Sequence, residues 1–131
     1  GDYDTDRFLY QFVREVDYCS GALLATRRSL FEDLDGFDRR YRPAYYEDVD
    51  YCFKARKAGY RVYYQPESTI VHLEGATSGV DPRRGAKRYF ALNQQKFVEK
   101  WKRLLRSYPV RPSHDDAAAW QALAVATRAG K

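Results

Sequence analysis

The stretch AYYEDVDYCFKARKAG, residues 44–59, decides the fold predicted for this chain. Two tyrosines lead into three carboxylates within four positions, Glu47, Asp48 and Asp50. The apolar residues that follow recur at the i, i+3, i+4 spacing of a helix. The acids lie where a helix dipole favours anions, and cations followed by Gly59 indicate a helix end. We therefore predict a helix that begins at the acids.

The acids at the start of this helix have two explanations. N-capping and the helix dipole account for one or two acids at such a position, so three crowded carboxylates need a second reason. Like charges raise the pKa of a carboxyl group and a helix N-terminus lowers it, so such a group could be a general base or a neighbour of a metal ion. Tyr45 and Tyr46 could line a binding groove, and plain packing explains them equally well.

The length and amino-acid composition of the chain indicate one globular domain of modest size. The chain has 131 residues, 44% hydrophobic and 31% charged, which separates it from disordered proteins. No apolar run approaches the roughly 20 residues of a membrane span, and no signal peptide opens the chain. We expect a cytoplasmic location, with the inner face of the cell membrane as a further candidate. Cys19 and Cys52 lack metal-ligand spacing and are expected to be buried free thiols.

The remaining segments predict an α/β fold in which the acidic helix packs on a small mixed sheet. The predicted elements are, in order, a helix or strand at 7–16, a buried strand at 20–26, a short helix at 27–34, strands at 61–65 and 68–73, and an amphipathic helix from about 83 to 108. An alanine-rich helix after residue 112 is expected to be a connector. We therefore predict one domain over residues 1–108 and a helical linker over residues 109–131.

The net charge of +5 predicts an anionic partner. Four cations at the entry to the last long helix are candidates for binding phosphates, although solvated surface charge is the commoner role for each of them singly. They are Arg83, Arg84, Lys87 and Arg88.

A rival hypothesis makes the chain a binding module, in which the basic helix around residues 96–106 docks on a membrane surface or nucleic acid. Burial of Phe97 and Trp101 would count against it. A third hypothesis is a purely structural interaction domain.

A series of short motifs resembles the C-terminal half of family-2 inverting glycosyltransferases of the GT-A fold, and rhamnosyltransferases of bacterial polysaccharide or O-antigen synthesis in particular. The motifs are SGA at 20–22, DGFD at 35–38, YEDVDYC at 46–52, AGYRV at 58–62, PE at 66–67 and His72. Each is weak alone, but their order is specific, and the resemblance runs from about Val16 to Trp101. It implies a partial GT-A fold with a C-terminal helical extension.

The resemblance implies roles for individual residues. Asp48 would be the general base, assisted by Glu47, and Asp50 would join Tyr45 and Tyr46 in binding the acceptor. His72 would be a ligand of a divalent metal ion, Mn²⁺ or Mg²⁺, whose other ligands come from the N-terminal half of such enzymes. A carboxylate can deprotonate the attacking hydroxyl, and a divalent ion can neutralise the departing diphosphate. A lone histidine at this point is equally often a core or edge residue.

The resemblance also implies partners and a limit. The partners would be a nucleotide-sugar donor, a glycan or lipid-linked acceptor and the rest of the glycosyltransferase chain, with a membrane surface as a further candidate and no nucleic acid. The donor-binding half is missing from this sequence. We therefore expect the chain alone to be an inactive fragment of an enzyme for cell-envelope polysaccharide.

Overall fold

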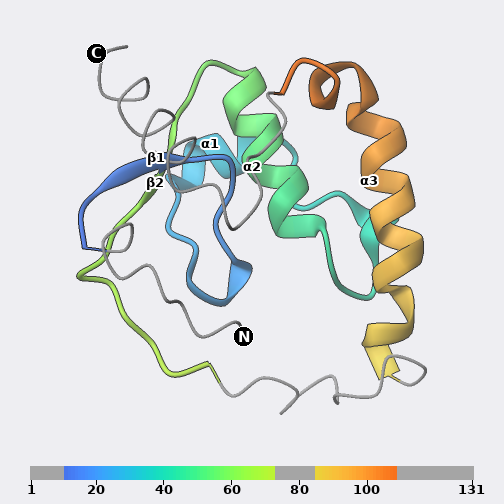
Figure 1. Cartoon of the computed structure of the whole chain (residues 1–131), viewed down its shortest axis with the longest axis horizontal. Helices are drawn as coiled ribbons and strands as arrows, with labels where there is room; N and C mark the ends of the chain where they lie inside the picture. The colour runs from blue at the N-terminus through green and yellow to red at the C-terminus, as the bar shows by residue number, and fades with distance from the viewer. Residues whose placement is uncertain (1–10, 73–84, 109–131) are drawn as a thin grey trace, which may run out of the picture. The chain divides into compact units, whose positions relative to one another are not determined.

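The computed structural model describes residues 11–72 and 85–108, which form a mixed α/β arrangement (Figure 1). The chain divides into two units, Gly1–Lys100 and Trp101–Lys131. Their elements are, in chain order, β1 (Arg14–Val16), the 3-10 turn η2 (Gly21–Leu23), α1 (Arg28–Asp33), η3 (Arg39–Tyr41), α2 (Glu47–Lys57), β2 (Val62–Tyr64), η4 (Gly85–Tyr89) and α3 (Phe90–Leu105).

The sheet has two antiparallel strands in the described part of the chain, where a small mixed sheet was predicted. β1 pairs with β2 so that Val16 lies opposite Val62. β2 confirms the strand predicted at 61–65, and β1 resolves the ambiguity at 7–16 in favour of a strand for the described residues.

The strand predicted at 68–73 is wrong for residues 68–72, which have no regular structure. A turn closed by the Ser68 N–H bonding to the Gln65 carbonyl leads the chain away from β2. Ile70 and Val71 are 51% and 87% exposed, so their apolar pattern has no buried face to fill.

The buried strand predicted at 20–26 is also wrong. Residues Gly21–Leu23 form η2, and most of the segment is exposed. The Ser20 hydroxyl accepts a hydrogen bond from the Ala22 N–H at 3.2 Å. A serine that bonds the local backbone in this way competes with strand pairing and favours a turn.

The two central helix predictions are confirmed. α1 ends where Asp35 and Gly36 adopt left-handed backbone angles, and α2 runs from the first acid to Lys57. The residue that caps α2 is Tyr46, which gives no side-chain hydrogen bond, so the acids lie inside the first turn. The Lys54 ammonium on α2 donates to the carbonyls of Leu34 and Gly36 and thereby joins the end of α1 to α2.

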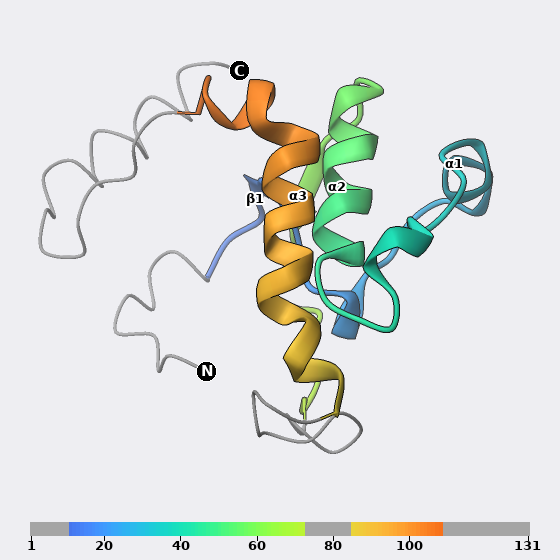
Figure 2. The ribbon, with the colours of Figure 1, turned by 90° about the vertical axis from the view of Figure 1, so that its right-hand side faces the viewer.

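The apolar core includes aromatic contacts between α2 and α3, which lie side by side in Figure 2. Phe97 of α3 is 6% exposed, and its ring centroid is 4.9 Å from that of Phe53 on α2. Trp101 is 7% exposed. Both burials count against the rival hypothesis in which the aromatic face of this helix docks on a membrane or nucleic acid.

The long C-terminal helix is confirmed as η4 followed by α3. No helix in residues 11–72 and 85–108 has the length and apolar character needed to cross a membrane. The predicted linker at 109–131 lies outside the described residues.

Cys19 and Cys52 are free thiols, as predicted, although only Cys52 is fully buried.

Candidate functional site

Asp48 occupies the second position of α2, and both its carboxylate oxygens are held by backbone groups. Oδ2 accepts a hydrogen bond from the Gly21 N–H at 2.7 Å, and Oδ1 accepts one from the Val49 N–H at 2.8 Å. The side chain remains partly exposed. A carboxylate offers about four lone-pair positions, so these bonds leave room for a further donor. Asp48 therefore has a fixed orientation and the capacity to receive a proton.

Gly21 approaches Asp48 so closely that a larger residue would disturb the contact. A Cβ atom at position 21 would lie 3.3 Å from Asp48 Cβ and 3.4 Å from Oδ2. We expect Gly21→Ala to lengthen the bond to Oδ2 and to lower the free energy of unfolding by about 1 kcal/mol, the scale of one hydrogen bond. Urea unfolding of the full-length protein measures this loss.

The control for Gly21→Ala is a double-mutant cycle with Asp48→Ala, which removes the group that the new methyl would meet. The penalty of Gly21→Ala should largely disappear in that background. An equal penalty in both backgrounds would show that the methyl group is tolerated or rejected by something other than Asp48.

Glu47 begins α2, and its Oε2 atom is buried without a hydrogen-bond partner among the described residues. Burial raises the pKa of Glu47 above its ordinary value of 4.5, and the charge of Asp48 raises it further. Its environment therefore stabilises the protonated form of Glu47 relative to a carboxyl group in water.

The raised pKa of Glu47 predicts a pH dependence of stability. The folded protein holds this proton more tightly than the unfolded chain, so the contribution of Glu47 is complete below about pH 4.5 and is lost as pH rises through the folded pKa. We expect Glu47→Gln to become progressively more stable relative to wild type between about pH 4 and pH 7. Urea unfolding across this range tests the trend, with Glu67→Gln, at an exposed position, as control. Parallel profiles for wild type and Glu47→Gln would contradict it.

Tyr45 and Tyr46 adopt left-handed backbone angles, with φ of 74° and 75°. Such angles cost about 1–3 kcal/mol each for residues other than glycine and persist only where surrounding contacts hold them. Both rings are partly exposed and meet the Phe90 ring, with centroids 5.7 and 5.3 Å away. Tyr46 also lies 5.4 Å from the Phe97 ring. Their role in binding an acceptor stays a prediction.

The burial of Asp50 contradicts its predicted role in acceptor binding, because its side chain is 0% exposed. The Lys100 ammonium lies 2.8 Å from its carboxylate, and the Tyr41 hydroxyl donates to Oδ1 at 3.1 Å. Burial, followed by the charge of Asp50, raises the pKa of Tyr41 and keeps this hydroxyl protonated. Residues two apart on a helix point about 200° apart, so Asp50 faces the interior while Asp48 does not.

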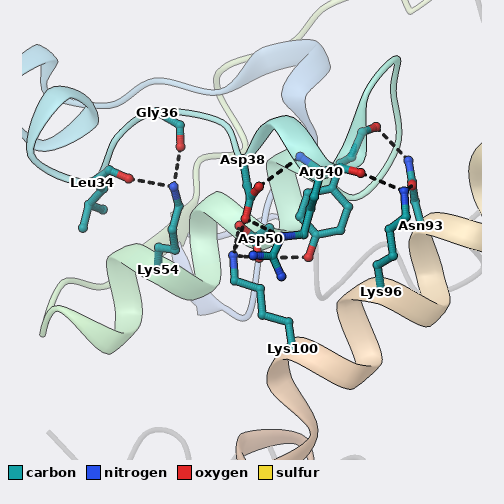
Figure 3. A network of polar contacts seen from close by, with 10 residues as sticks. Leu34, Gly36, Asp38, Arg40, Asp50, Lys54, Asn93, Lys96 and Lys100 are labelled. Atoms are coloured by element: carbon teal, nitrogen blue, oxygen red, sulfur yellow. Dashed lines mark hydrogen bonds and ion pairs between the residues drawn. The ribbon is translucent and has the colours of Figure 1, made fainter.

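The structure adds three side chains of α3 that the sequence reasoning missed, namely Asn93, Lys96 and Lys100. Figure 3 shows them reaching from one face of the helix toward the segment before α2. Asn93 is 0% exposed and donates hydrogen bonds to backbone carbonyls of that segment. The available signal was a polar amide four residues before Phe97, on the face predicted to be buried.

The predicted phosphate-binding cations are only partly described. Arg83 and Arg84 lie outside the described residues. Lys87 and Arg88 belong to η4, where the Arg88 guanidinium donates to the Tyr89 hydroxyl at 2.8 Å. Phosphate binding by these residues stays a prediction.

His72 is exposed at the end of the first described range, so it is not a core residue. Over residues 11–72 and 85–108, no group of three or more His, Cys, Asp or Glu side chains could hold a metal ion. The described residues therefore do not assemble a divalent-metal site by themselves. The role of His72 as a single ligand stays a prediction.

Three of the relatives found by comparison with known proteins are named as glycosyltransferases. An N-acetylglucosaminyl-diphospho-decaprenol L-rhamnosyltransferase of Mycobacterium tuberculosis (strain CDC 1551 / Oshkosh) is 41% identical over 69 residues, which are 53% of this chain and 22% of the relative. Rhamnosyltransferase WbbL of Escherichia coli (strain K12) is 39% identical over 57 residues, 44% of this chain and 21% of the relative. A galactofuranosyl glycosyltransferase of Leishmania donovani is 36% identical over 59 residues, 45% of this chain and 14% of the relative.

The chain spans about a fifth of the length of the two rhamnosyltransferases. No solved structure matches it. Residues 3–91, more than half of the chain, match a family described as Glycosyltransferase like family 2. This range includes η2 and α2, and with them the hydrogen bond between Gly21 and Asp48. The protein therefore belongs to the glycosyltransferase-like family 2.

Proposed function

We propose that this chain forms the acceptor side of an inverting glycosyltransferase with a GT-A-like fold, in which Asp48 is the general base. The observation that carries the proposal is the Asp48 carboxylate, oriented by two backbone N–H groups and still partly exposed. Family membership supports sugar transfer as the reaction. A fixed carboxylate with spare acceptor capacity is what deprotonation of a sugar hydroxyl requires.

The proposed reaction is a direct displacement at the anomeric carbon of the donor sugar. The acceptor hydroxyl donates a hydrogen bond to Asp48, and its oxygen attacks the face opposite the nucleotide diphosphate. The new C–O bond forms as the bond to the diphosphate breaks, the hydroxyl proton passes to Asp48, and the configuration inverts. The N–H groups of Gly21 and Val49 keep the carboxylate in place during this step.

A divalent cation would neutralise charge on the departing diphosphate if one is bound. The described residues do not gather the ligands for such an ion, so the proposed mechanism contains no step that depends on it. His72 is the candidate that this chain would offer, with further ligands from other parts of the protein.

The names of the relatives suggest the substrates. We propose nucleotide-linked rhamnose as donor and a glycan carried on a lipid diphosphate as acceptor, because two of the relatives are named as rhamnosyltransferases and one name includes a diphospho-decaprenol acceptor. Such an acceptor would place the reaction at the cytoplasmic face of the membrane. Because the chain spans only part of those relatives, we also propose that it does not transfer sugar by itself.

The test is a transfer assay with the full-length protein. Nucleotide-linked rhamnose, galactofuranose and N-acetylglucosamine would be offered in turn with an N-acetylglucosaminyl-diphospho-polyprenol acceptor, and products identified by mass spectrometry and NMR. We expect transfer of rhamnose, with an anomeric configuration opposite to that of the donor. A product that retains the donor configuration, or no transfer from any nucleotide sugar, would overturn the proposal. Transfer by the isolated chain would overturn its proposed inactivity.

A further inference from the structure

We propose that Asn93 is a positioning residue for the reaction, because it holds the segment that leads into α2 and so fixes where Asp48 stands. The inference rests on the proposed function, since it takes Asp48 as the base. Asn93 belongs to α3 and lies 45 residues after Asp48 in the sequence. Its influence passes through the backbone of residues 41–46, which we call the entry segment.

The Asn93 amide binds three backbone carbonyl groups of the entry segment at once. Its Nδ2 atom lies 2.7 Å from the Tyr41 carbonyl oxygen, 2.8 Å from that of Ala44 and 3.2 Å from that of Tyr45. Two N–H bonds thus serve three acceptors, and the side chain is 0% exposed. Because water does not reach this amide, its N–H groups have no competing acceptor from solvent, and the bonds to the three carbonyls tie the entry segment to α3.

The orientation of the Asn93 amide is itself determined. Its Oδ1 atom accepts a hydrogen bond from the Lys96 ammonium at 2.9 Å, so the nitrogen must face the carbonyls. Lys96 also donates to the Arg40 carbonyl at 2.8 Å, just before the entry segment. The residues lie three apart on α3 and therefore share a face. One face of α3 thus holds the backbone on both sides of Tyr41.

The entry segment leads directly into the first turn of α2, which carries Asp48. Tyr45, whose carbonyl Asn93 binds, and Tyr46 adopt left-handed conformations, and the Tyr46 carbonyl accepts the first helical bond of α2 from the Asp50 N–H at 2.9 Å. Only two residues separate Tyr45 from Asp48. A left-handed pair without glycine would relax if the Ala44 and Tyr45 carbonyls were released, and the first turn of α2 would move with it.

The test compares Asn93→Asp with a matched control in the full-length protein. Asn93→Asp keeps the shape of the side chain but removes both N–H donors and turns oxygen atoms toward three carbonyls. Val62→Ala is the control, because it removes buried volume from β2, a different element. Rates are measured with nucleotide-linked rhamnose and lipid-linked acceptor, at a temperature where circular dichroism shows both variants folded.

We expect Asn93→Asp to lower kcat on the order of 10- to 100-fold, because a displacement of about 1 Å at a catalytic group has effects of this size. The KM for the nucleotide sugar should change less than about threefold, since the donor is bound elsewhere. Val62→Ala should keep kcat within about twofold even where it lowers the melting temperature more. Hydrogen exchange should accelerate in peptides covering residues 41–50 in Asn93→Asp and not in Val62→Ala.

A kcat within about threefold of wild type in Asn93→Asp would overturn the inference, as would an equal loss in both variants. If Asn93→Asp does not fold, Asn93→Ser, which keeps one donor, is measured by the same criteria, with an expected loss of about tenfold. Asp48→Asn distinguishes failure of the proposed function from failure of this inference. An active Asp48→Asn enzyme would show that Asp48 is not the general base. An inactive Asp48→Asn enzyme together with a normal Asn93→Asp enzyme would refute only the positioning role of Asn93.

Discussion

Replacing Asp48 with asparagine in the full-length protein is expected to lower kcat by about 10²- to 10⁴-fold, the usual contribution of a general base. The amide has nearly the same shape but cannot take a proton from the acceptor hydroxyl. The KM for the nucleotide sugar should stay close to that of wild type, because the contacts of Asp48 are with η2 and with its own helix. Initial rates of sugar transfer under saturating substrates measure the effect.

The control for Asp48→Asn is Asp33→Asn, which makes the same chemical change at an exposed position on α1. Its kcat should be unchanged. Asp48→Asn also loses one acceptor for the N–H groups that the carboxylate now binds, so its folding must be checked by unfolding in urea. A folded Asp48→Asn enzyme with more than a tenth of wild-type kcat would fit the structural-domain hypothesis instead.

Replacing Lys100 with methionine is expected to lower the free energy of unfolding by about 3–5 kcal/mol, because it removes the ammonium group that pairs with the fully buried Asp50 carboxylate. Lys100 also lies 2.9 Å from Asp38, so the change releases a second carboxylate. Urea unfolding of the full-length protein measures the loss. Lys57→Met, at an exposed position on the same helix as Asp50, should change stability by no more than about 0.5 kcal/mol.

The double variant Lys100→Met with Asp50→Asn separates charge from packing. Asparagine removes the buried negative charge while it can still accept the hydrogen bond from Tyr41. We expect the double variant to recover much of the stability lost in Lys100→Met. If Lys100→Met alone costs less than about 1 kcal/mol, Asp50 does not depend on this cation, and the account of the buried pair is wrong.

Local sequence signals predicted α2 well, because the acids at its start, its apolar spacing and the cations and glycine at its end all lie within one short stretch of sequence. α1, β2 and α3 were predicted for the same reason. The errors at 20–26 and 68–72 arose where short apolar runs resemble strands. Residues 20–26 form a turn because the Ser20 hydroxyl bonds the local backbone. Residues 68–72 form no strand because their apolar side chains have no buried face to pack on.

The site could be predicted only in part. The sequence predicted that Glu47 and Asp48 lie in the first turn of α2, because acids at a helix start are visible in the sequence, and their roles in the reaction stay predictions. The opposite directions of Asp48 and Asp50 were missed, since three adjacent acids were read as one cluster. Asn93 and Lys100 could not be found from spacing, because their partners lie about 50 residues away along the chain. Such pairs are set by how α3 packs, which the local pattern does not specify.

The face of α3 that holds the entry segment limits how the gene can be shortened or recombined. A truncated protein ending just after His72 would keep all of the motifs named in the sequence analysis, and would look complete to anyone designing an expression clone from them. It would nevertheless lose Asn93, Lys96 and Lys100, and with Lys100 the ammonium group that lies 2.8 Å from the buried Asp50 carboxylate. Chimaeras that exchange this region between enzymes should therefore place their junction beyond residue 100.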